Sequence, residues 1–419
     1  MIHLTRRALA AGGLALLTTR AQAAETIKWL HVEVNREVIA IWNDAVHAFE
    51  AGHPGVSVQP QYLENEAFKA KLTTLLQSPD KPAMFYSWAG GVLRAQIEAG
   101  VLEDLTEQTR GYADTLTPSA LAAFTANGRI WGLPYALNKV GIFYNKALFA
   151  KAGVDGTKVK TWDDFLGAVK QLQAAGITPL ATGGADKWPL ALIYDYLCLR
   201  QGGKAGFEGA MRGENGGFAG PDFVKAGNCF RQLADLKPFQ PGFLGAKYLP
   251  ATGLFADGKA AMTVAISVVY NVQRAIAADK KGLDDATIGW IDFPTLPGGK
   301  GLPTDTLGGI VGWLVSKGAP KPTPEFLKSF VAADVQKKLA AGGYIVPVVK
   351  GADAAITSPF MRTIAGELAR STYHQNFYDQ ELGPAVGRVV NDASAEIAGG
   401  TMSGEDAAKA IEAAWKQGN

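Results

Sequence analysis

The chain has 419 residues, with 41 lysine and arginine residues against 39 aspartate and glutamate residues. This charge balance excludes a strongly basic nucleic-acid-binding protein, and a hydrophobic content of 47% excludes a disordered chain. The two cysteines, Cys198 and Cys229, are too few for a disulfide scaffold or a four-thiolate zinc site. Whether they pair with each other is left open. The length predicts two domains, or three.

Residues 1–23 have the pattern of an export signal. Arg6 and Arg7 precede the apolar run 8–17, which is too short to span a bilayer, and residues 21–23 form a small-x-small cleavage site. The adjacent arginines resemble a twin-arginine signal, with an ordinary secretory signal as the alternative. We therefore expect a soluble periplasmic protein that is cleaved near Ala23.

The mature chain alternates predicted strands and helices. Short apolar runs predict strands, and apolar residues repeating every three or four positions predict helices. The predicted strands are 27–32, 56–62, 83–88, 177–182 and 310–315. The predicted helices are 35–52, 67–76, 161–176, 188–200, 222–236, 325–341 and 403–415. This alternation indicates an α/β protein with mostly parallel sheets flanked by helices.

Polar residues follow the first three predicted strands. In open α/β sheets ligands bind beyond the carboxyl ends of the strands, so these loops are candidates for a binding site. Carboxylates and amides bind hydroxyl groups, and an indole packs on the apolar face of a sugar ring, so the set suits a neutral polyhydroxyl ligand. Asn35 is equally well explained as a helix cap. The candidates are His31, Glu33, Asn35, Glu64, Asn65, Glu66 and Trp88.

Sequence motifs typical of enzymes are missing. The chain has no G-x-x-x-x-G-K-[ST] phosphate loop, no G-x-G-x-x-G after a strand and no G-x-S-x-G nucleophile elbow. Its five histidines form no H-x-x-x-H or H-E-x-x-H pair. We therefore expect no cofactor, no metal and no catalytic residue. A pair of glycosidase carboxylates among the 39 acids is not excluded on sequence alone.

Several segments resemble a known family. Residues 141–153 read GIFYNKALFAKAG, residues 161–165 read TWDDF, and residues 255–263 read FADGKAAMT. These strings, in this order, resemble the carbohydrate-binding solute-binding proteins of ABC importers, related to maltose- and oligosaccharide-binding proteins. The resemblance covers nearly the whole mature chain.

The resemblance implies the type II periplasmic-binding-protein fold, with two α/β lobes and a ligand cleft between them. It assigns 24–136 and the return segment 306–343 to an N-terminal lobe, and 137–305 and the helical end 344–419 to a C-terminal lobe. It also implies hinge closure around a sugar and docking on the permease subunits of an importer. No bond in the ligand would be broken. We expect a monomer, because the cleft must open and close.

The resemblance also implies site residues. Besides Glu64, Asn65 and Trp88 it implies Asn138, where the chain first crosses between the lobes, and the neighbouring pair Asp186 and Trp188. It also implies Gly308 and Gly309, in a strand that lines the cleft, and Tyr373 and His374, in a late aromatic segment.

One departure from the family concerns the stretch after residue 263. Many relatives carry a stacking tryptophan where this chain has Val268, and either Tyr270 substitutes for it or the pocket is smaller at this point. The departure favours a mono- or disaccharide, or a small glycoside, over a long oligosaccharide. Which sugar binds is not determined.

Alternative functions stay open at this point. The first is a binding protein of the same fold for an anionic sugar or a non-sugar solute. The second is an exported glycoside-active enzyme. The third is a sensor that presents its ligand to a receptor rather than to a permease.

Overall fold

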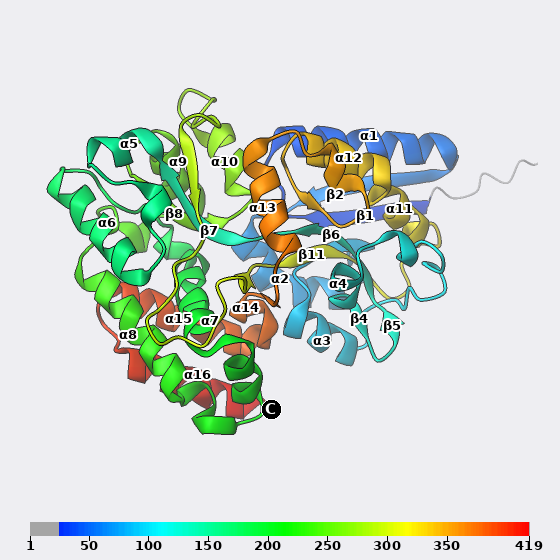
Figure 1. Ribbon diagram of the computed structural model, residues 1–419. Helices are drawn as coiled ribbons and strands as arrows, with labels where there is room; N and C mark the ends of the chain where they lie inside the picture. Colours follow the sequence, from blue (N-terminus) through cyan, green and yellow to red (C-terminus); the bar gives the residue numbers. More distant parts are fainter. Residues whose placement is uncertain (1–24, 419) are drawn as a thin grey trace, which may run out of the picture.

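Two β-sheets of different size organise the computed structural model, which describes residues 25–418 (Figure 1). The larger sheet has the strand order β12-β6-β11-β3-β1-β2, and the smaller has the order β8-β7-β9. The large-sheet strands are β1 (Glu25–His31), β2 (Val56–Tyr62), β3 (Met84–Ser87), β6 (Gly132–Leu137), β11 (Ile310–Val315) and β12 (Val346–Pro347). The small-sheet strands are β7 (Val140–Asn145), β8 (Met262–Ile266) and β9 (Ile288–Ile291).

Each sheet and its helices form one lobe, and the two lobes lie side by side (Figure 1). The large-sheet lobe contains α1 (Arg36–Gly52), α2 (Asn65–Gln77), α3 (Gly90–Glu98), α4 (Pro118–Ala122), α11 (Thr323–Phe330) and α12 (Ala333–Ala341). The small-sheet lobe contains α5 (Lys146–Lys151), α6 (Trp162–Ala174), α7 (Trp188–Met211), α8 (Pro221–Asp235), α9 (Tyr248–Ala256), α10 (Val269–Ile276), α13 (Pro359–Ala369), α14 (Tyr378–Glu381), α15 (Gly383–Gly399) and α16 (Gly404–Gly418).

Helices cover both faces of the large sheet, because successive side chains of each strand point to opposite faces. Trp29 of β1 packs with Trp42 of α1 and with Phe330 of α11, with ring centroids 5.1 and 4.7 Å away. The next residue, Leu30, packs on the other face with Phe68 of α2. β1 is parallel to both β2 and β3, so the carboxyl ends of these three strands meet at one edge of the sheet. The other pairings of the two sheets are antiparallel, so the expectation of mostly parallel sheets is wrong.

The small-sheet lobe is built around α7. This helix is buried from Pro189 to Gly203 and packs against α8 and α15. No side chain caps the start of this helix. Pro189 lies in its first turn, where a backbone N–H has no partner within the helix, so the N–H that proline lacks removes no hydrogen bond. The predicted helices at 188–200 and 222–236 are confirmed as α7 and α8.

Two sequence predictions of elements are wrong. The expected strand 177–182 makes only isolated bridges at Leu180, to Phe239 and Met262. The expected helix 325–341 is interrupted, because Ala332 takes an extended conformation (φ −63°, ψ 159°) between α11 and α12.

The chain passes between the lobes where β6 leads to β7 and again before β11. Near the second crossing, β10 (Thr306–Leu307) pairs in parallel with β13 (His374–Gln375). After α12 the chain stays in the large-sheet lobe, since β12 pairs with β6, and Val348, Val349 and Ala352 lie in the core of that lobe. The boundary expected at residue 343 therefore falls too early.

Within residues 25–418, no helix has the length and apolar character needed to cross a bilayer. Cys198 and Cys229 are both free thiols, so the pairing left open by the sequence does not occur here. The predicted export signal, residues 1–23, lies outside the described residues.

Candidate functional site

The carboxyl ends of β1, β2 and β3 bring predicted site residues to one edge of the large sheet. His31 ends β1, Tyr62 ends β2, and Trp88 directly follows β3. The His31 ring is 5% exposed and lies 6.0 Å from the Tyr62 ring. Burial lowers the pKa of His31 to about 4, so its imidazole is neutral, and Nδ1 accepts a hydrogen bond from the Glu33 amide (3.2 Å).

The loop after β1 is shaped by two side chains that bind backbone amides. Glu33 Oε1 accepts hydrogen bonds from the amides of Val34 (2.9 Å) and Asn35 (2.7 Å). Burial raises the pKa of Glu33, and these two amide bonds oppose the rise. Asn35 Oδ1 accepts from the amides of Glu37 and Val38, so Asn35 is the N-cap of α1. The structure thus gives Asn35 a capping role.

The loop after β2 starts α2. Glu64 Oε2 accepts hydrogen bonds from the amides of Glu66 (3.1 Å) and Ala67 (3.2 Å), which makes Glu64 the cap of this helix. Asn65 Nδ2 donates to Glu66 Oε1 at 2.7 Å. Of these residues it is Glu66 that lines the cavity described next.

A cavity of about 760 Å³ lies between the lobes, which is a size typical of small-molecule sites. Residues of the large-sheet lobe form one wall and residues of the small-sheet lobe form the other. Side chains on the first wall include Glu66, Phe68, Lys69, Tyr86 and Trp88. Side chains on the second include Asp186, Lys187, Lys247, Asp379, Arg388 and Asn391.

Trp88 provides an aromatic surface on the first wall. It is half-buried, and its ring packs edge-on against Phe68 (5.5 Å) and Tyr86 (5.0 Å). The Lys69 ammonium lies 5.5 Å from the Trp88 ring centroid. An indole that lines a cavity can accept the apolar face of a ligand.

Asp186 lies on the opposite wall of the cavity, whereas Trp188, the other member of the predicted pair, does not line it. Asp186 Oδ2 accepts a hydrogen bond from the Tyr248 amide (2.7 Å), and the Trp188 and Tyr248 rings lie 4.7 Å apart. The Tyr248 hydroxyl is buried and has no partner among residues 25–418. Burial raises the pKa of Tyr248, and the negative charge of Glu33 adds to the rise.

Charged groups converge beside Trp88. Lys69 forms ion pairs with Asp379 (3.0 Å) and Glu66 (3.7 Å). Burial acts to lower the pKa of Lys69, but Asp379 and Glu66 outweigh it and the pKa is raised. Burial raises the pKa of Glu66, and Asp186 and Asp379 add to this against the opposing effect of Lys69. Sequence reasoning did not single out Lys69 or Asp379.

Asn138, Gly308 and Gly309 lie at the crossings between the lobes, outside the residues that line the cavity. Asn138 is 4% exposed, and its amide donates to the Gly309 carbonyl at 2.8 Å. A Cβ atom at Gly308 would collide with the Asn138 carbonyl, and one at Gly309 would meet the Phe377 ring. Close packing thus accounts for both glycines.

The expectation that Tyr270 replaces a stacking tryptophan is wrong. The residue is 3% exposed, its ring stacks on Phe360 (5.0 Å), and the Arg274 guanidinium lies 4.1 Å from the ring centroid. Its hydroxyl donates to Asp285 Oδ1 at 2.6 Å. Tyr270 therefore packs inside the small-sheet lobe and offers no surface to the cavity.

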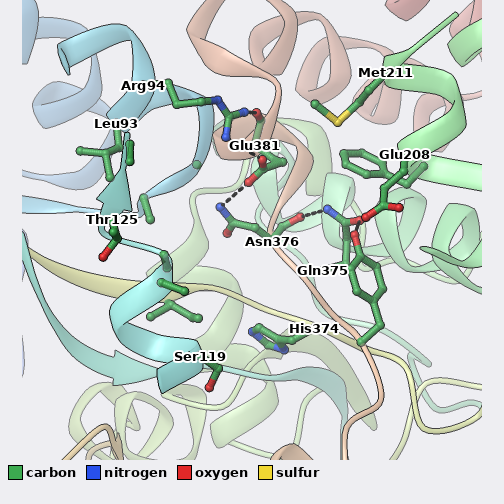
Figure 2. A pocket seen from close by; sticks show the side chains of 18 of the residues that line it. Leu93, Arg94, Ser119, Thr125, Glu208, Met211, His374, Gln375, Asn376 and Glu381 are labelled. Atoms are coloured by element: carbon green, nitrogen blue, oxygen red, sulfur yellow. Dashed lines mark hydrogen bonds and ion pairs between the residues drawn. The ribbon is translucent and has the colours of Figure 1, made fainter. Parts of the chain in front are cut away.

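Tyr373 and His374 line a separate pocket of about 400 Å³ on another side of α3 (Figure 2). The Tyr373 hydroxyl donates to Gln375 (2.6 Å), and His374 Nδ1 shares a hydrogen bond with the Thr306 hydroxyl (2.9 Å). Burial, helped by Lys139, lowers the pKa of His374 to about 4. These two predicted residues thus do not line the cavity at Trp88. Of all the predicted site residues, Glu66, Trp88 and Asp186 are the three that line it.

The chain matches a family pattern over most of its length and individual relatives over a smaller part. The sequence pattern of the bacterial extracellular solute-binding protein family covers residues 34–337. The chain is similar to a probable sugar-binding periplasmic protein of Mesorhizobium japonicum, with 33% identity over 170 residues, which is 40% of each chain. It is also similar to an uncharacterized ABC transporter extracellular-binding protein of Pyrococcus horikoshii, with 28% identity over 190 residues, which is 44% of each chain. The match thus spans less than half of either relative.

The fold can be compared with a solved chitin oligosaccharide binding protein. The two chains superpose with a TM-score of 0.86 at 25% identity, over 94% of this chain and 98% of the other. The architecture of two α/β lobes is that of a type II periplasmic solute-binding protein, as expected from the sequence. The chain therefore belongs to the bacterial extracellular solute-binding protein family.

Proposed function

We propose that this protein is the substrate-binding component of an ABC importer and that its ligand is a sugar. The observation that carries the proposal is the pairing of the Trp88 ring with carboxylates around a cavity between two lobes. Trp88 and Tyr86 offer aromatic surface, while Glu66 and Asp186 offer acceptors for hydroxyl groups.

The size of the cavity supports a mono- or disaccharide, or a small glycoside. Its volume of about 760 Å³ and its mixed aromatic and polar lining suit such a ligand. Because Tyr270 is packed away and Val268 replaces the usual tryptophan, a long oligosaccharide has less aromatic surface to bind. The names of the relatives in Mesorhizobium and of the chitin oligosaccharide binding protein also support a carbohydrate ligand.

In this proposal the lobes close around the sugar by bending at the crossings near Asn138 and Gly308, and the closed protein docks on the membrane permease. The sugar is returned intact, so the protein is not an enzyme, and it needs no cofactor or metal. It acts as a monomer in the periplasm. Residues 1–23 direct its export by the twin-arginine route and are removed near Ala23.

The test uses the protein from Ala24 to Asn419 in a thermal-shift screen followed by calorimetry. The panel contains neutral mono-, di- and oligosaccharides, anionic sugars and polyamines. A sugar present at about 100 times its dissociation constant adds about 2.7 kcal/mol to the free energy of unfolding. Stabilisation by a neutral sugar that is recovered unchanged would support the proposal. Stabilisation by none of the sugars, or cleavage of a glycoside, would contradict it.

The proposed export route is tested separately in the full chain. Replacement of Arg6 and Arg7 by lysine should leave the protein in the cytoplasm if the twin-arginine route is used. Continued export of the double variant would indicate an ordinary secretory signal instead.

A further inference from the structure

Lys69 connects the proposed sugar-binding tryptophan to the opposite lobe. Its ammonium lies 5.5 Å from the Trp88 ring centroid and forms an ion pair with Asp379 at 3.0 Å. Lys69 is on α2 and Trp88 follows β3, both in the large-sheet lobe, whereas Asp379 is on α14 in the small-sheet lobe. The ion pair therefore joins two segments that are 310 positions apart in sequence.

Both partners of this ion pair are largely shielded from water. The side chain of Lys69 is 25% exposed and that of Asp379 is 11% exposed, so solvent screens their attraction less than that of a surface pair. Asp379 Oδ2 also accepts a hydrogen bond from Asn391 Nδ2 (3.3 Å), which ties the carboxylate to α15. The position of the Lys69 ammonium thus depends on the position of the small-sheet lobe.

Two aromatic rings and one ammonium group contact the Trp88 ring. Phe68 and Tyr86 contact it edge-on, and the Lys69 ammonium is the cation beside it. A cation over an indole is attracted by the negative charge of the ring face and restricts where the ring can lie. Asn376 Nδ2 from the small-sheet lobe also donates to the Trp88 carbonyl (3.3 Å), so backbone and ring are both linked to that lobe.

We propose that Lys69 is a positioning residue of the sugar site, which fixes the Trp88 ring when Asp379 of the opposite lobe holds its ammonium. The inference rests on the proposed function, since it assigns a role within the same cavity. The Lys69–Asp379 ion pair (3.0 Å) joins the two lobes, and it holds the ring in the position that receives the sugar.

A second ion pair between the lobes offers a matched control. Arg94 of α3 donates to Glu381 Oε1 (3.0 Å) and to the Glu381 carbonyl (2.7 Å), as Figure 2 shows. This pair also joins α3 to α14, and Arg94 lines the 400 Å³ pocket rather than the cavity at Trp88. Loss of Arg94 removes a contact between the lobes without touching the Trp88 ring.

The experiment measures binding of the best sugar from the panel by calorimetry and by stopped-flow kinetics. The variants are Lys69→Met, Lys69→Arg, Asp379→Asn and Arg94→Met, each first checked for cooperative unfolding without sugar. We expect Lys69→Met to weaken binding about tenfold, mainly through faster dissociation. Lys69→Arg keeps a cation at this position and should stay within about threefold of the wild type. Arg94→Met should stay within about twofold.

A double variant tests whether the two residues act as one unit. If Lys69 acts through Asp379, then Lys69→Met combined with Asp379→Asn binds no more weakly than Lys69→Met alone. Full additivity of the two losses would overturn the proposal, as would wild-type affinity in Lys69→Met or an equal loss in Arg94→Met. If the wild type bound no sugar at all, the proposed function itself would fail. That result differs from one in which the wild type and Lys69→Met bind the sugar equally well, which contradicts the role of Lys69 alone.

Discussion

The carbonyl oxygen of Asn138 occupies the space that a Cβ atom would need at Gly308. The Gly308 amide donates to the Gln375 carbonyl (2.9 Å), and the Asn138 amide donates to the Gly309 carbonyl (2.8 Å). The two chain segments that connect the lobes are therefore in direct backbone contact. Their close approach fixes the point about which the lobes move in the proposed mechanism.

Replacement of Gly308 by alanine should lower the free energy of unfolding by about 1–3 kcal/mol, because the added methyl group forces the two crossings apart. Urea unfolding of Gly308→Ala and the wild type would measure the loss. Gly167→Ala is the control, since that glycine lies in α6 with no atom within 4 Å of the added Cβ. The control should gain up to about 1 kcal/mol from helix propensity. Equal stability of Gly308→Ala and the wild type would contradict the packing argument.

The sequence was sufficient to predict the parallel strands and the residues at their carboxyl ends. Local periodicity identified β1, β2 and β3, and the geometry of parallel sheets then placed His31 and Trp88 at one edge. The capping role of Asn35 was also foreseeable, because a helix start needs an acceptor for its free amides.

Contacts between the lobes could not be predicted in this way. Lys69 and Asp379 lie on different lobes, and no local pattern links residues so far apart in sequence. The expectation for Tyr270 was wrong because the position of a residue in the sequence does not tell which way its side chain points. Its ring and hydroxyl are both occupied inside the small-sheet lobe, by Phe360 and Asp285.

Replacement of Trp88 by alanine should weaken sugar binding at least tenfold, since the apolar face of the sugar loses its aromatic partner (about 1.4 kcal/mol or more). Calorimetry with the best sugar of the panel measures the change. Trp88→Phe retains a ring and should lose less affinity than Trp88→Ala. Unchanged affinity in Trp88→Ala, with a normal unfolding transition, would remove Trp88 from the site.

Replacement of Tyr270 by phenylalanine should lower stability by about 1 kcal/mol and leave sugar affinity unchanged. The variant loses the hydrogen bond to Asp285 but keeps the ring that stacks on Phe360. Asp285 retains Arg274 (2.8 Å) and Ser358 (3.0 Å) as partners, which limits the loss. Thermal unfolding and calorimetry test the two parts. A clear loss of affinity would return Tyr270 to the binding site.

Acid should destabilise the protein partly through His374. Its pKa is lowered from 6.5 to about 4 in the folded protein, by burial first and by Lys139 second. Between about pH 6.5 and 4 the unfolded chain therefore binds a proton that the folded chain does not, so stability falls as the pH falls through this window. His31 acts in the same direction, whereas the raised pKa values of Glu33 and Asp195 act in the opposite direction.

A variant isolates the contribution of this one histidine from the opposing carboxyl groups. His374→Gln removes the titrating group, so the wild type should lose about 2 kcal/mol more than the variant between pH 7 and pH 5. The variant is expected to be less stable at pH 7, because it loses the hydrogen bond to Thr306 (2.9 Å), and the two stabilities should converge on acidification. Urea unfolding at pH 5, 6 and 7 gives both curves. Parallel curves would mean that His374 titrates near its ordinary pKa in the folded protein and is not shielded at the junction of the lobes.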